Sequence, residues 1–364
     1  MSQRIRVAVI FGGRSSEHQI SCVSAGSVIR ALDDTKYEIV PIGITREGKW
    51  VLESADTERL AIRDGVFPEV NPDNDVVLFT PDPSATHLVI QSSVPDVLNH
   101  VDVAFPVLHG PWGEDGTVQG LLELAGIPYV GSGVFTSAVA MDKAHLKAMM
   151  RASGIPVGPY EVVTDGQWRN HKDDALARIA KLGLPLFVKP CRAGSSVGIS
   201  KVKSYGELVA TIELAHEHDP KVIVEASIEN AREVECGVLG GERGTRASVC
   251  AEIIVREGHE FYDFTAKYVD DSVDLVVPAD LPTSVSDRVR KIAIEAFDAI
   301  DGEGLSRVDV FVAGDEILIN EINTMPGFTS VSMFPRMWAH SGVDYPELVD
   351  TLIQDALRRG TGLR

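Results

Sequence analysis

Four polar residues near the C-terminal end are spaced so that they could bind a metal ion and an anion. Beginning at Arg307, polar and apolar side chains alternate, which predicts a strand with Arg307 and Asp309 on one face. With a three-residue loop at 314–316, Asp309 lies opposite Glu321, and the same register pairs Arg307 with Asn323. Hard oxygen ligands of this kind suit Mg²⁺ shared with substrate phosphates. A solvated polar face on a strand pair is the alternative, and the hairpin alone leaves both open.

A loop rich in glycine and serine in the middle of the chain could bind an anion. It follows a buried strand that carries Lys189, and it contains Gly194, Ser195, Ser196 and Gly198. Glycines let backbone N–H groups approach an anion, the hydroxyls add donors, and the lysine adds a positive charge. The pattern GxxxxGK[ST] occurs nowhere in the chain, so this is not a Walker A loop. An ordinary Gly/Ser hairpin is the alternative.

Two further candidates follow predicted parallel strands, at the edge where open α/β sheets bind ligands. Glu17 comes after a glycine-containing turn and could hold a substrate ammonium. A capping box between Ser16 and Gln19 at the start of a helix would explain the same acid. His109 begins a glycine-bearing loop, either as a substrate contact or as a packed imidazole. The spacing GxGxxG is absent, which disfavours a nicotinamide dehydrogenase.

Residues 262–275 lose strand periodicity, which predicts a lid that closes over a ligand. Its aromatic side chains could pack on the ligand, and Lys267 could reach a phosphate. A solvated surface loop is the alternative. Glu225 lies at the end of one predicted strand and Glu233 at the start of the next, and both could bind polar groups of adenine and ribose. Surface acids are the alternative, because they are common in so acidic a chain.

The elements that must position these residues begin with alternating strands and helices, which predict an open parallel α/β sheet. The predicted strands are residues 6–11, 38–44 and 101–108, and the predicted helices are residues 16–32 and 117–125. Residues 53–99 form a predicted insertion with a short hairpin near residues 76–79 and 87–91. We expect these segments to form an N-terminal domain, residues 1–130.

The rest of the chain predicts two α+β units. In the first, residues 131–221, we expect helices at 134–152, at 173–182 and after a capping box at 204–207, and strands at 185–190 and 199–202. The second, residues 222–364, has antiparallel strand patterns at 222–225, 233–239 and 248–255, an amphipathic helix at 284–300, and the polar hairpin.

Size and composition predict a soluble globular protein. The chain has 364 residues, 44% of them hydrophobic, which allows several domains and a substantial core. The net charge of −19 argues against nucleic acid or an anionic membrane as partner. Four cysteines show no CxxC or metal-type spacing, and the first apolar run is too short for a signal peptide. These features favour the cytoplasm.

Seven short motifs occur in a fixed order: residues 12–17 (GGRSSE), 109–116 (HGPWGEDG), 141–143 (MDK), 189–198 (KPCRAGSSVG), 262–268 (YDFTAKY), 307–309 (RVD) and 321–327 (EINTMPG). Together they resemble the D-alanine–D-alanine ligase family of the ATP-grasp superfamily, over about residues 5–355. The resemblance implies a Rossmann-like N-terminal domain followed by a two-part ATP-grasp fold, α/β and α+β, whose antiparallel sheets enclose ATP. It also implies synthesis of a peptidoglycan precursor in the cytoplasm, by a homodimer.

The resemblance also assigns roles to particular residues. The nucleotide ligands that it implies are Lys143, Lys189 and Ser196 near the phosphates, Glu225, Ala226 and Ile228 at the adenine hinge, Glu233 at the ribose, and Phe261 and Phe311 beside the base. Asp309, Glu321 and Asn323 would hold two Mg²⁺ ions, with Mn²⁺ as a substitute and K⁺ as a further candidate ion.

For the reaction, the resemblance implies phosphorylation of one D-alanine and attack by a second. Lys267 would offset charge on the transferred phosphoryl group, and Arg307 with the Gly327 N–H would meet the oxyanion. The substrate contacts that it implies are Glu17, held by Ser195 and Tyr268, together with His109, Ser332 and Met333. The chain departs from relatives at Phe264, where many carry Tyr, and at Ala193, where an acid is frequent.

Two rival functions remain at this point. One is an ATP-grasp ligase that joins other substrates, such as a depsipeptide-forming enzyme. It would share the nucleotide contacts and differ in the second-substrate pocket, and Tyr268 favours an amine over D-lactate as nucleophile. The other is a nucleotide-sensing module without turnover, which would not need Arg307, Lys267 and the paired acids together.

Overall fold

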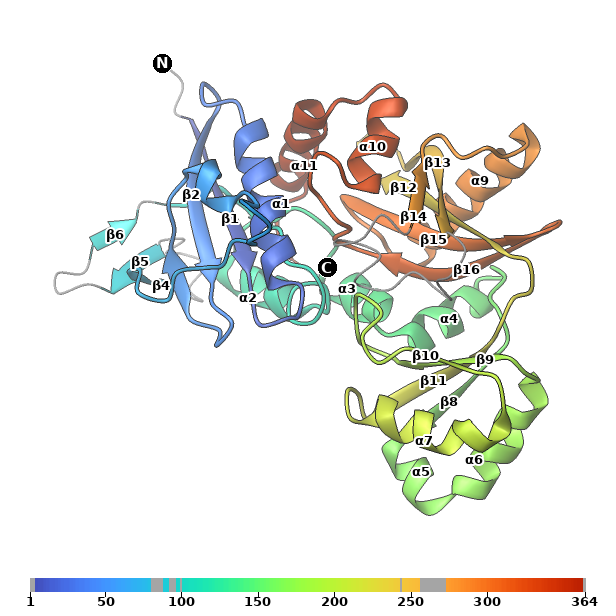
Figure 1. The fold of residues 1–364 in the computed structure, drawn as a ribbon. Helices are drawn as coiled ribbons and strands as arrows, with labels where there is room; N and C mark the ends of the chain where they lie inside the picture. Colours follow the sequence, from blue (N-terminus) through green and yellow to red (C-terminus); the bar gives the residue numbers. More distant parts are fainter. Residues whose placement is uncertain are drawn as a thin grey trace.

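The computed structural model describes residues 4–79, 88–91, 96–98, 100–242, 244–255 and 273–362. Figure 1 shows an N-terminal body, a C-terminal sheet beside it, and a central unit that packs below that sheet. The predicted lid lies outside the described residues except for its last three positions. Those three belong to strand β14 (Val273–Val276), which pairs with β13 (Arg246–Val255), so the prediction of an irregular loop is wrong there. Among the described residues, no helix combines the length and the apolar character needed to cross a bilayer.

The N-terminal sheet has seven strands in the order β6-β5-β4-β3-β2-β1-β7. Strands β1 (Ile5–Gly12), β2 (Tyr37–Ile44) and β7 (Val103–Pro106) are parallel, as predicted. Strands β3 (Trp50–Leu52), β4 (Val76–Phe79), β5 (Leu88–Gln91) and β6 (Asp96–Leu98) continue it in antiparallel fashion. The predicted hairpin in the insertion is therefore confirmed as β4–β5, but the sheet is mixed because β3, which precedes the insertion, and the strands of the insertion extend its edge in antiparallel fashion. The helices of this domain are α1 (His18–Ala31), η1 (Thr57–Leu60) and α2 (Thr117–Ala125).

The single helix predicted over residues 134–152 is two helices, α3 (Val134–Met141) and α4 (Lys143–Ala152). Asp142 has an extended backbone, and its carboxylate accepts hydrogen bonds from the N–H groups of Ala144 and His145. An aspartate in this position caps a new helix, and this explains the break. Lys143 consequently stands in the first turn of α4.

The central unit is a four-stranded antiparallel sheet in the order β10-β9-β11-β8. Its strands are β8 (Tyr160–Thr164), β9 (Leu186–Pro190), β10 (Ser200–Val202) and β11 (Lys221–Ala226). Helices α5 (Asp165–Asn170), α6 (Lys172–Ile179), η2 (Ala180–Leu182) and α7 (Tyr205–His216) belong to the same unit. The predicted boundary at residue 221 falls too early, because β11 pairs with β8 and β9. The predicted capping box of α7 does not form, since the Ser204 side chain makes no capping bond.

The C-terminal sheet has the order β14-β13-β12-β15-β16, and all its pairs are antiparallel. It contains β12 (Arg232–Leu239), β15 (Leu305–Ala313) and β16 (Glu316–Asn323), and α9 (Thr283–Ala299) packs on it. Helix α10 (Met333–His340) packs on β12 and β13 of this sheet, whereas α11 (Tyr345–Arg359) packs against β7 and α1 of the N-terminal domain. Phe334 of α10 and Leu352 of α11 share a core with Phe105 of β7. Figure 1 shows α11 beside α1, so the last helices join the N-terminal and C-terminal bodies.

Candidate functional site

One cleft of about 740 Å³ lies where the three units meet. Every predicted site residue that the structure describes lines it: Glu17, His109, Lys143, Lys189, Ser195, Ser196, Glu225, Ala226, Ile228, Glu233, Arg307, Asp309, Phe311, Glu321, Asn323, Gly327, Ser332 and Met333. The predicted Phe261, Lys267 and Tyr268 lie outside the described residues. Residues that the sequence motifs place far apart are therefore brought to one cavity by the fold.

The pairing of β15 with β16 is the one predicted around the metal site, but it arises differently. Asp309 pairs with Glu321, and Arg307 with Asn323. The turn has two residues rather than three, because Ala313 already pairs with Glu316. A β-bulge after Asp309 adds one residue to β16 and restores the predicted register. The prediction was right at the site and wrong at the turn.

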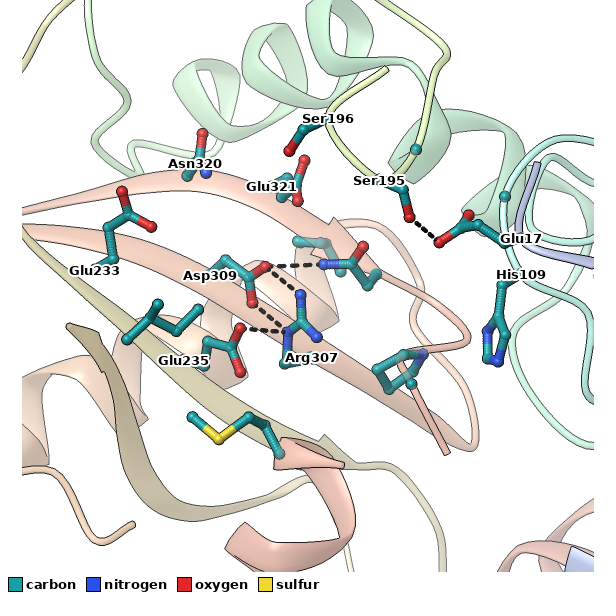
Figure 2. Close-up of a pocket in the computed structure, with 18 of the residues that line it drawn as sticks. Glu17, His109, Ser195, Ser196, Glu233, Glu235, Arg307, Asp309, Asn320 and Glu321 are labelled. Atoms are coloured by element: carbon teal, nitrogen blue, oxygen red, sulfur yellow. Dashed lines mark hydrogen bonds and ion pairs between the residues drawn. The ribbon is translucent and has the colours of Figure 1, made fainter. Parts of the chain in front are cut away.

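The bulge also changes which side chains face the cleft. Ile317 and Ile319 are buried, and after the bulge Ile322 is the next buried residue. Asn320 and Glu321 are consecutive and both line the cleft (Figure 2). Sequence analysis missed Asn320. A signal was present, since the buried positions of β16 advance by two and then by three.

Arg307 lies between two carboxylates of neighbouring strands (Figure 2). Its Nε and Nη2 donate to the two carboxylate oxygens of Asp309, each at 2.7 Å, and its Nε is 3.3 Å from Glu235 Oε1. Burial would lower the pKa of Arg307, but Asp309 and Glu235 hold it well above its usual value. Glu235, which is 3% exposed and pairs with Asp309 across β12 and β15, was not predicted. It follows Glu233 by two residues, a spacing that indicates the same face of a strand.

The donor set at this place fits magnesium. Asn323 donates its Nδ2 to Asp309 at 3.0 Å, which turns its amide oxygen away from that carboxylate. Two carboxylates and an amide oxygen from paired strands are hard ligands of the kind that Mg²⁺ uses together with phosphate oxygens. Among the residues that the structure describes, no group of three His, Cys, Asp or Glu side chains could hold a metal by itself. We infer that substrate oxygens would complete the coordination.

The opposite wall of the cleft carries lysines. Lys143 Nζ is 3.1 Å from Glu321 Oε2 and donates to the Ala193 carbonyl at 3.2 Å. Burial would lower the pKa of Lys143, but Glu321 raises it above its usual value. Lys189 Nζ donates to Glu225 Oε2 at 2.7 Å. Both predicted phosphate ligands therefore lie beside the cleft, each next to a carboxylate.

The Gly/Ser loop holds Glu17 in a tight place. Ser195 donates its hydroxyl to Glu17, and Ser195 and Ser196 have φ of +47° and +59°, a strained left-handed backbone for residues other than glycine. A Cβ at Gly110 or Gly194 would lie 2.6 or 2.8 Å from Glu17 Oε2, so a side chain at either position would displace the Glu17 carboxylate, and the φ of +75° at Gly110 further favours glycine there. The predicted capping box is wrong. Glu17 is itself the N-cap residue of α1, and no side chain caps that helix.

His109 and Glu114 attach the N-terminal domain to the loop that follows β16. The His109 Nδ1 is 2.9 Å from the Met325 carbonyl, and its Nε2 is 3.0 Å from Ser24 Oγ. Glu114 accepts hydrogen bonds from the N–H of Met325 at 2.9 Å and of Gly110 at 2.7 Å. Burial lowers the pKa of His109. For Glu114, burial and the nearby Glu17 carboxylate raise the pKa to about 8. Both ring nitrogens of His109 are thus engaged within the protein.

The two ends of the cleft differ in chemistry. At one end Glu233 pairs with Phe311 across β12 and β15, and Phe187 of β9 lines the same cavity. At the other end Ser332 accepts a hydrogen bond from the Thr329 N–H at 3.1 Å, in the loop that contains Gly327. Figure 2 shows Glu233 and Asn320 at the first end, Arg307, Asp309 and Glu321 in the middle, and Glu17 and His109 at the far end.

Comparison with known proteins agrees with this arrangement. Residues 6–132 match the family model for the N-terminus of D-ala D-ala ligase, and residues 149–354 match the model for its C-terminus. The D-alanine–D-alanine ligase of Streptomyces griseus subsp. griseus is 55% identical, covering 99% of this chain and 94% of the relative. That of Mycobacterium avium is 53% identical, covering 100% and 99%.

Two solved structures have the same fold. VanG D-Ala:D-Ser ligase from Enterococcus faecalis has a TM-score of 0.85 and 38% identity, covering 97% of this chain and 100% of that one. The D-alanine–D-alanine ligase from Coxiella burnetii has a TM-score of 0.83 and 34% identity, covering 98% and 95%. The expected Rossmann-like domain and two-part ATP-grasp fold are thereby confirmed. The chain belongs to the D-alanine–D-alanine ligase family.

Proposed function

We propose that this cleft joins two D-alanines, at the expense of ATP, in the synthesis of a cell-wall precursor. The order of groups along the cleft supports the proposal (Figure 2). An apolar and acidic end suits a nucleoside, the carboxylates and lysines suit a triphosphate, and Glu17 suits an ammonium group. The observation that carries most weight is the register that sets Arg307 and Asp309 against Asn323 and Glu321.

We assign the nucleotide end to residues from both sheets. Glu225 with the backbone of Ala226 and Ile228 would bind adenine, and Glu233 would bind ribose. Lys143 and Lys189 would bind phosphate oxygens, with Ser196 and its neighbouring N–H groups as further donors. Asn320 is added to this set because the bulge turns it into the cleft. Asp309, Glu321 and Asn323 would hold Mg²⁺, which neutralises phosphate charge and orients the γ-phosphate.

The reaction needs two steps, and the chain's groups fit both. In the first, a carboxylate oxygen of one D-alanine bonds to the γ-phosphorus, the bond to ADP breaks, and an acyl phosphate forms. In the second, the amine of another D-alanine attacks the acyl carbon, loses a proton, and phosphate leaves. Arg307 and the Gly327 N–H would stabilise the oxyanion of the second step, and Glu17 would hold the first ammonium.

The remaining assignments shape the substrate subsites. Ser332 and Met333 line the cleft near Gly327 and would face the second D-alanine. His109 would shape the first subsite by fixing the Met325 loop. Lys267 and Tyr268, outside the described residues, would act from the lid. We also propose that the protein is a cytoplasmic homodimer, that Mn²⁺ can replace Mg²⁺, and that activity depends on K⁺. Size-exclusion chromatography tests the dimer. Replacement of each ion in the activity assay tests the two ion proposals.

An ADP-release assay tests the proposal directly. ADP and the ligated product should appear with ATP, Mg²⁺ and D-alanine, and not with L-alanine or without the divalent metal. ATP binding without ADP release, with every amino acid tried, would contradict ligation and favour a nucleotide-sensing module. Mass spectrometry of the product identifies which substrates were joined.

A second candidate is ligation of D-alanine to D-serine. The observation that favours it is the likeness to VanG, whose name gives D-Ala:D-Ser ligase activity, at 38% identity. Equal amounts of D-alanine and D-serine, or of D-alanine and D-lactate, should still yield mainly the D-alanine dipeptide. A predominant D-Ala-D-Ser product would replace the first candidate by the second.

A further inference from the structure

Lys147 is a buried lysine that belongs to none of the roles above. It lies one turn after Lys143 on α4, is 2% exposed, and does not line the cleft. Its Nζ is 3.2 Å from Glu225 Oε1 and donates to the Ile319 carbonyl at 3.3 Å. A lysine is rarely buried so completely without a specific partner. Its two partners are a nucleotide-binding candidate and the strand that carries the metal site.

Glu225 is shared between two lysines with different access. One carboxylate oxygen faces Lys189, which lines the cleft, and the other faces Lys147, which does not. Burial would raise the pKa of Glu225, but Lys147 and Lys189 together lower it to about 2. If Lys189 binds a phosphate oxygen, that phosphate competes with Glu225 for the positive charge of Lys189. Lys147 does not line the cleft, so it remains paired with Glu225 when the nucleotide is bound.

The neighbourhood fixes Lys147 relative to both sheets. On α4, Ala144 packs with Ile223 of the central sheet, whereas Leu146 and Met150 pack in the core of the C-terminal sheet. The N–H of Ile319 donates to the Pro156 carbonyl at 2.9 Å, so β16 is also held by the segment after α4. Ile319 immediately precedes the bulge that presents Asn320 and Glu321. Lys147 therefore connects Glu225 to the strand of the metal site.

We infer that Lys147 is a positioning residue that keeps Glu225 ionised and fixed as the acceptor for the 6-amino group of the purine, so that Lys189 can bind phosphate. The inference rests on the proposed function. An ionised carboxylate only accepts hydrogen bonds, so it favours adenine, which presents an N–H donor, over hypoxanthine, which presents an oxygen. Protonation or rotation of Glu225 would remove this discrimination.

The variant Lys147→Met tests the inference through nucleotide selectivity. ATP and ITP affinities are measured by calorimetry in the absence of turnover, with Mg²⁺ but without D-alanine. We expect ATP binding to weaken by about tenfold or more, because a charged hydrogen bond is lost through a less well-fixed Glu225. ITP binding should change far less, so the ATP/ITP ratio falls. Weakening of both nucleotides by the same factor would overturn the inference.

Arg151→Met is the matched control, since Arg151 lies on the next turn of α4 and stacks on Tyr160 away from the cleft. It should leave both affinities and the ratio unchanged. Failure of the proposed function would appear separately, as a wild-type protein that binds neither nucleotide. Wild-type binding with an unaltered ratio in Lys147→Met would contradict only the role of Lys147.

A double-variant cycle tests whether Lys147 acts through the charge of Glu225, and its comparison of Glu225→Gln with the double variant remains usable if Lys147→Met alone folds poorly, a large further loss of ATP affinity there refuting the inference. With Glu225→Gln the carboxylate charge is absent, and Lys147→Met should then cost little further ATP affinity. The double variant also avoids an uncompensated buried carboxylate, which favours folding. Equal losses from Lys147→Met in the wild-type and Glu225→Gln backgrounds would show that Lys147 acts on the structure in general and would refute the inference.

Discussion

The two walls of the cleft are built differently. On the C-terminal sheet, Glu235, Asp309 and Glu321 are aligned across adjacent strands, and Arg307 bonds within the same sheet. On the opposite wall, the charges come from separate elements. Lys143 begins α4, Lys189 lies near the end of β9, and Glu225 lies near the end of β11.

Because of this difference, the two walls suit different tasks: precise placement of groups around the reacting atoms, and binding of the nucleotide. Strand pairing fixes the distance between neighbouring side chains, so the sheet wall suits groups that must meet a transition state with little movement. Lysines on a helix and on a strand end are long and depend on how two units pack, so their wall suits binding of a polyphosphate. Substitution of Arg307 or Glu235 on the sheet wall should therefore lower turnover, and substitution of Lys143 on the lysine wall should weaken ATP binding.

The largest effect is expected for Arg307→Ala. Turnover should fall by about 100-fold or more, since a single oxyanion donor is typically worth that much, while ATP affinity changes little. Steady-state ADP release and calorimetry measure the two quantities. Arg232→Ala is the control, because Arg232 also forks onto a carboxylate of this sheet, Glu252, but does not line the cleft. A mild turnover defect in Arg307→Ala would mean that another group meets the oxyanion.

Next in size is Lys143→Met, which tests the lysine wall. Removing one charged donor to phosphate should weaken ATP binding about 10- to 100-fold. The KM for D-alanine should change much less. Lys172→Met, which breaks the exposed pair with Glu213, serves as a control for loss of a lysine. If Lys143→Met lowered turnover at saturating ATP without affecting ATP affinity, the distinction between the walls would be lost.

The sheet wall could be predicted from sequence because its information is local. Alternation gave the face of Arg307 and Asp309, and the correct pairing with Asn323 and Glu321 survived because a shorter turn and a bulge compensate each other. The bulge itself has a signal in the sequence, because the apolar positions of β16 advance by two residues from Ile317 to Ile319 but by three from Ile319 to Ile322. Strand periodicity therefore gave the faces of Arg307 and Asp309, but it did not give Glu235 or Asn320 on the same wall.

The lysine wall depends on contacts between distant segments, which periodicity does not encode. No local pattern links Lys147 to Glu225, because the central sheet folds between them. The break at Asp142 has a local signal, a capping aspartate, but helix-forming residues on both sides of it favoured one continuous helix. The resemblance to a known family supplied Lys143, not its contact with Glu321. Long-range packing thus decided what the sequence pattern left open.

A smaller effect is expected for Glu235→Gln, which sharpens the assignment of the sheet wall. The amide keeps a hydrogen-bond acceptor but removes the charge that helps to hold Arg307, so turnover should fall about tenfold. ATP affinity should be unchanged, because Glu235 acts through Arg307. Glu252→Gln is the matched control, a buried and ion-paired acid of the same sheet outside the cleft. Equal losses in both variants would indicate a general loss of sheet stability.

The most subtle expected effect concerns acid stability on the lysine wall. The pKa of Glu225 is lowered from 4.5 to about 2, so its ionised form stabilises the fold above pH 4.5, and this stabilisation is lost as the pH falls toward 2. In Lys147→Met one of the two positive charges that lower the pKa of Glu225 is absent, so burial raises this pKa above its wild-type value. Its free energy of unfolding should therefore lie furthest below that of wild type at neutral pH, and the gap should narrow as the pH is lowered. Urea unfolding between pH 7 and pH 4 measures this difference in the free energy of unfolding. For Arg151→Met, the difference from wild type should not change with pH. A gap that stays constant with pH would mean that Lys147 stabilises the wall by packing rather than through the charge of Glu225.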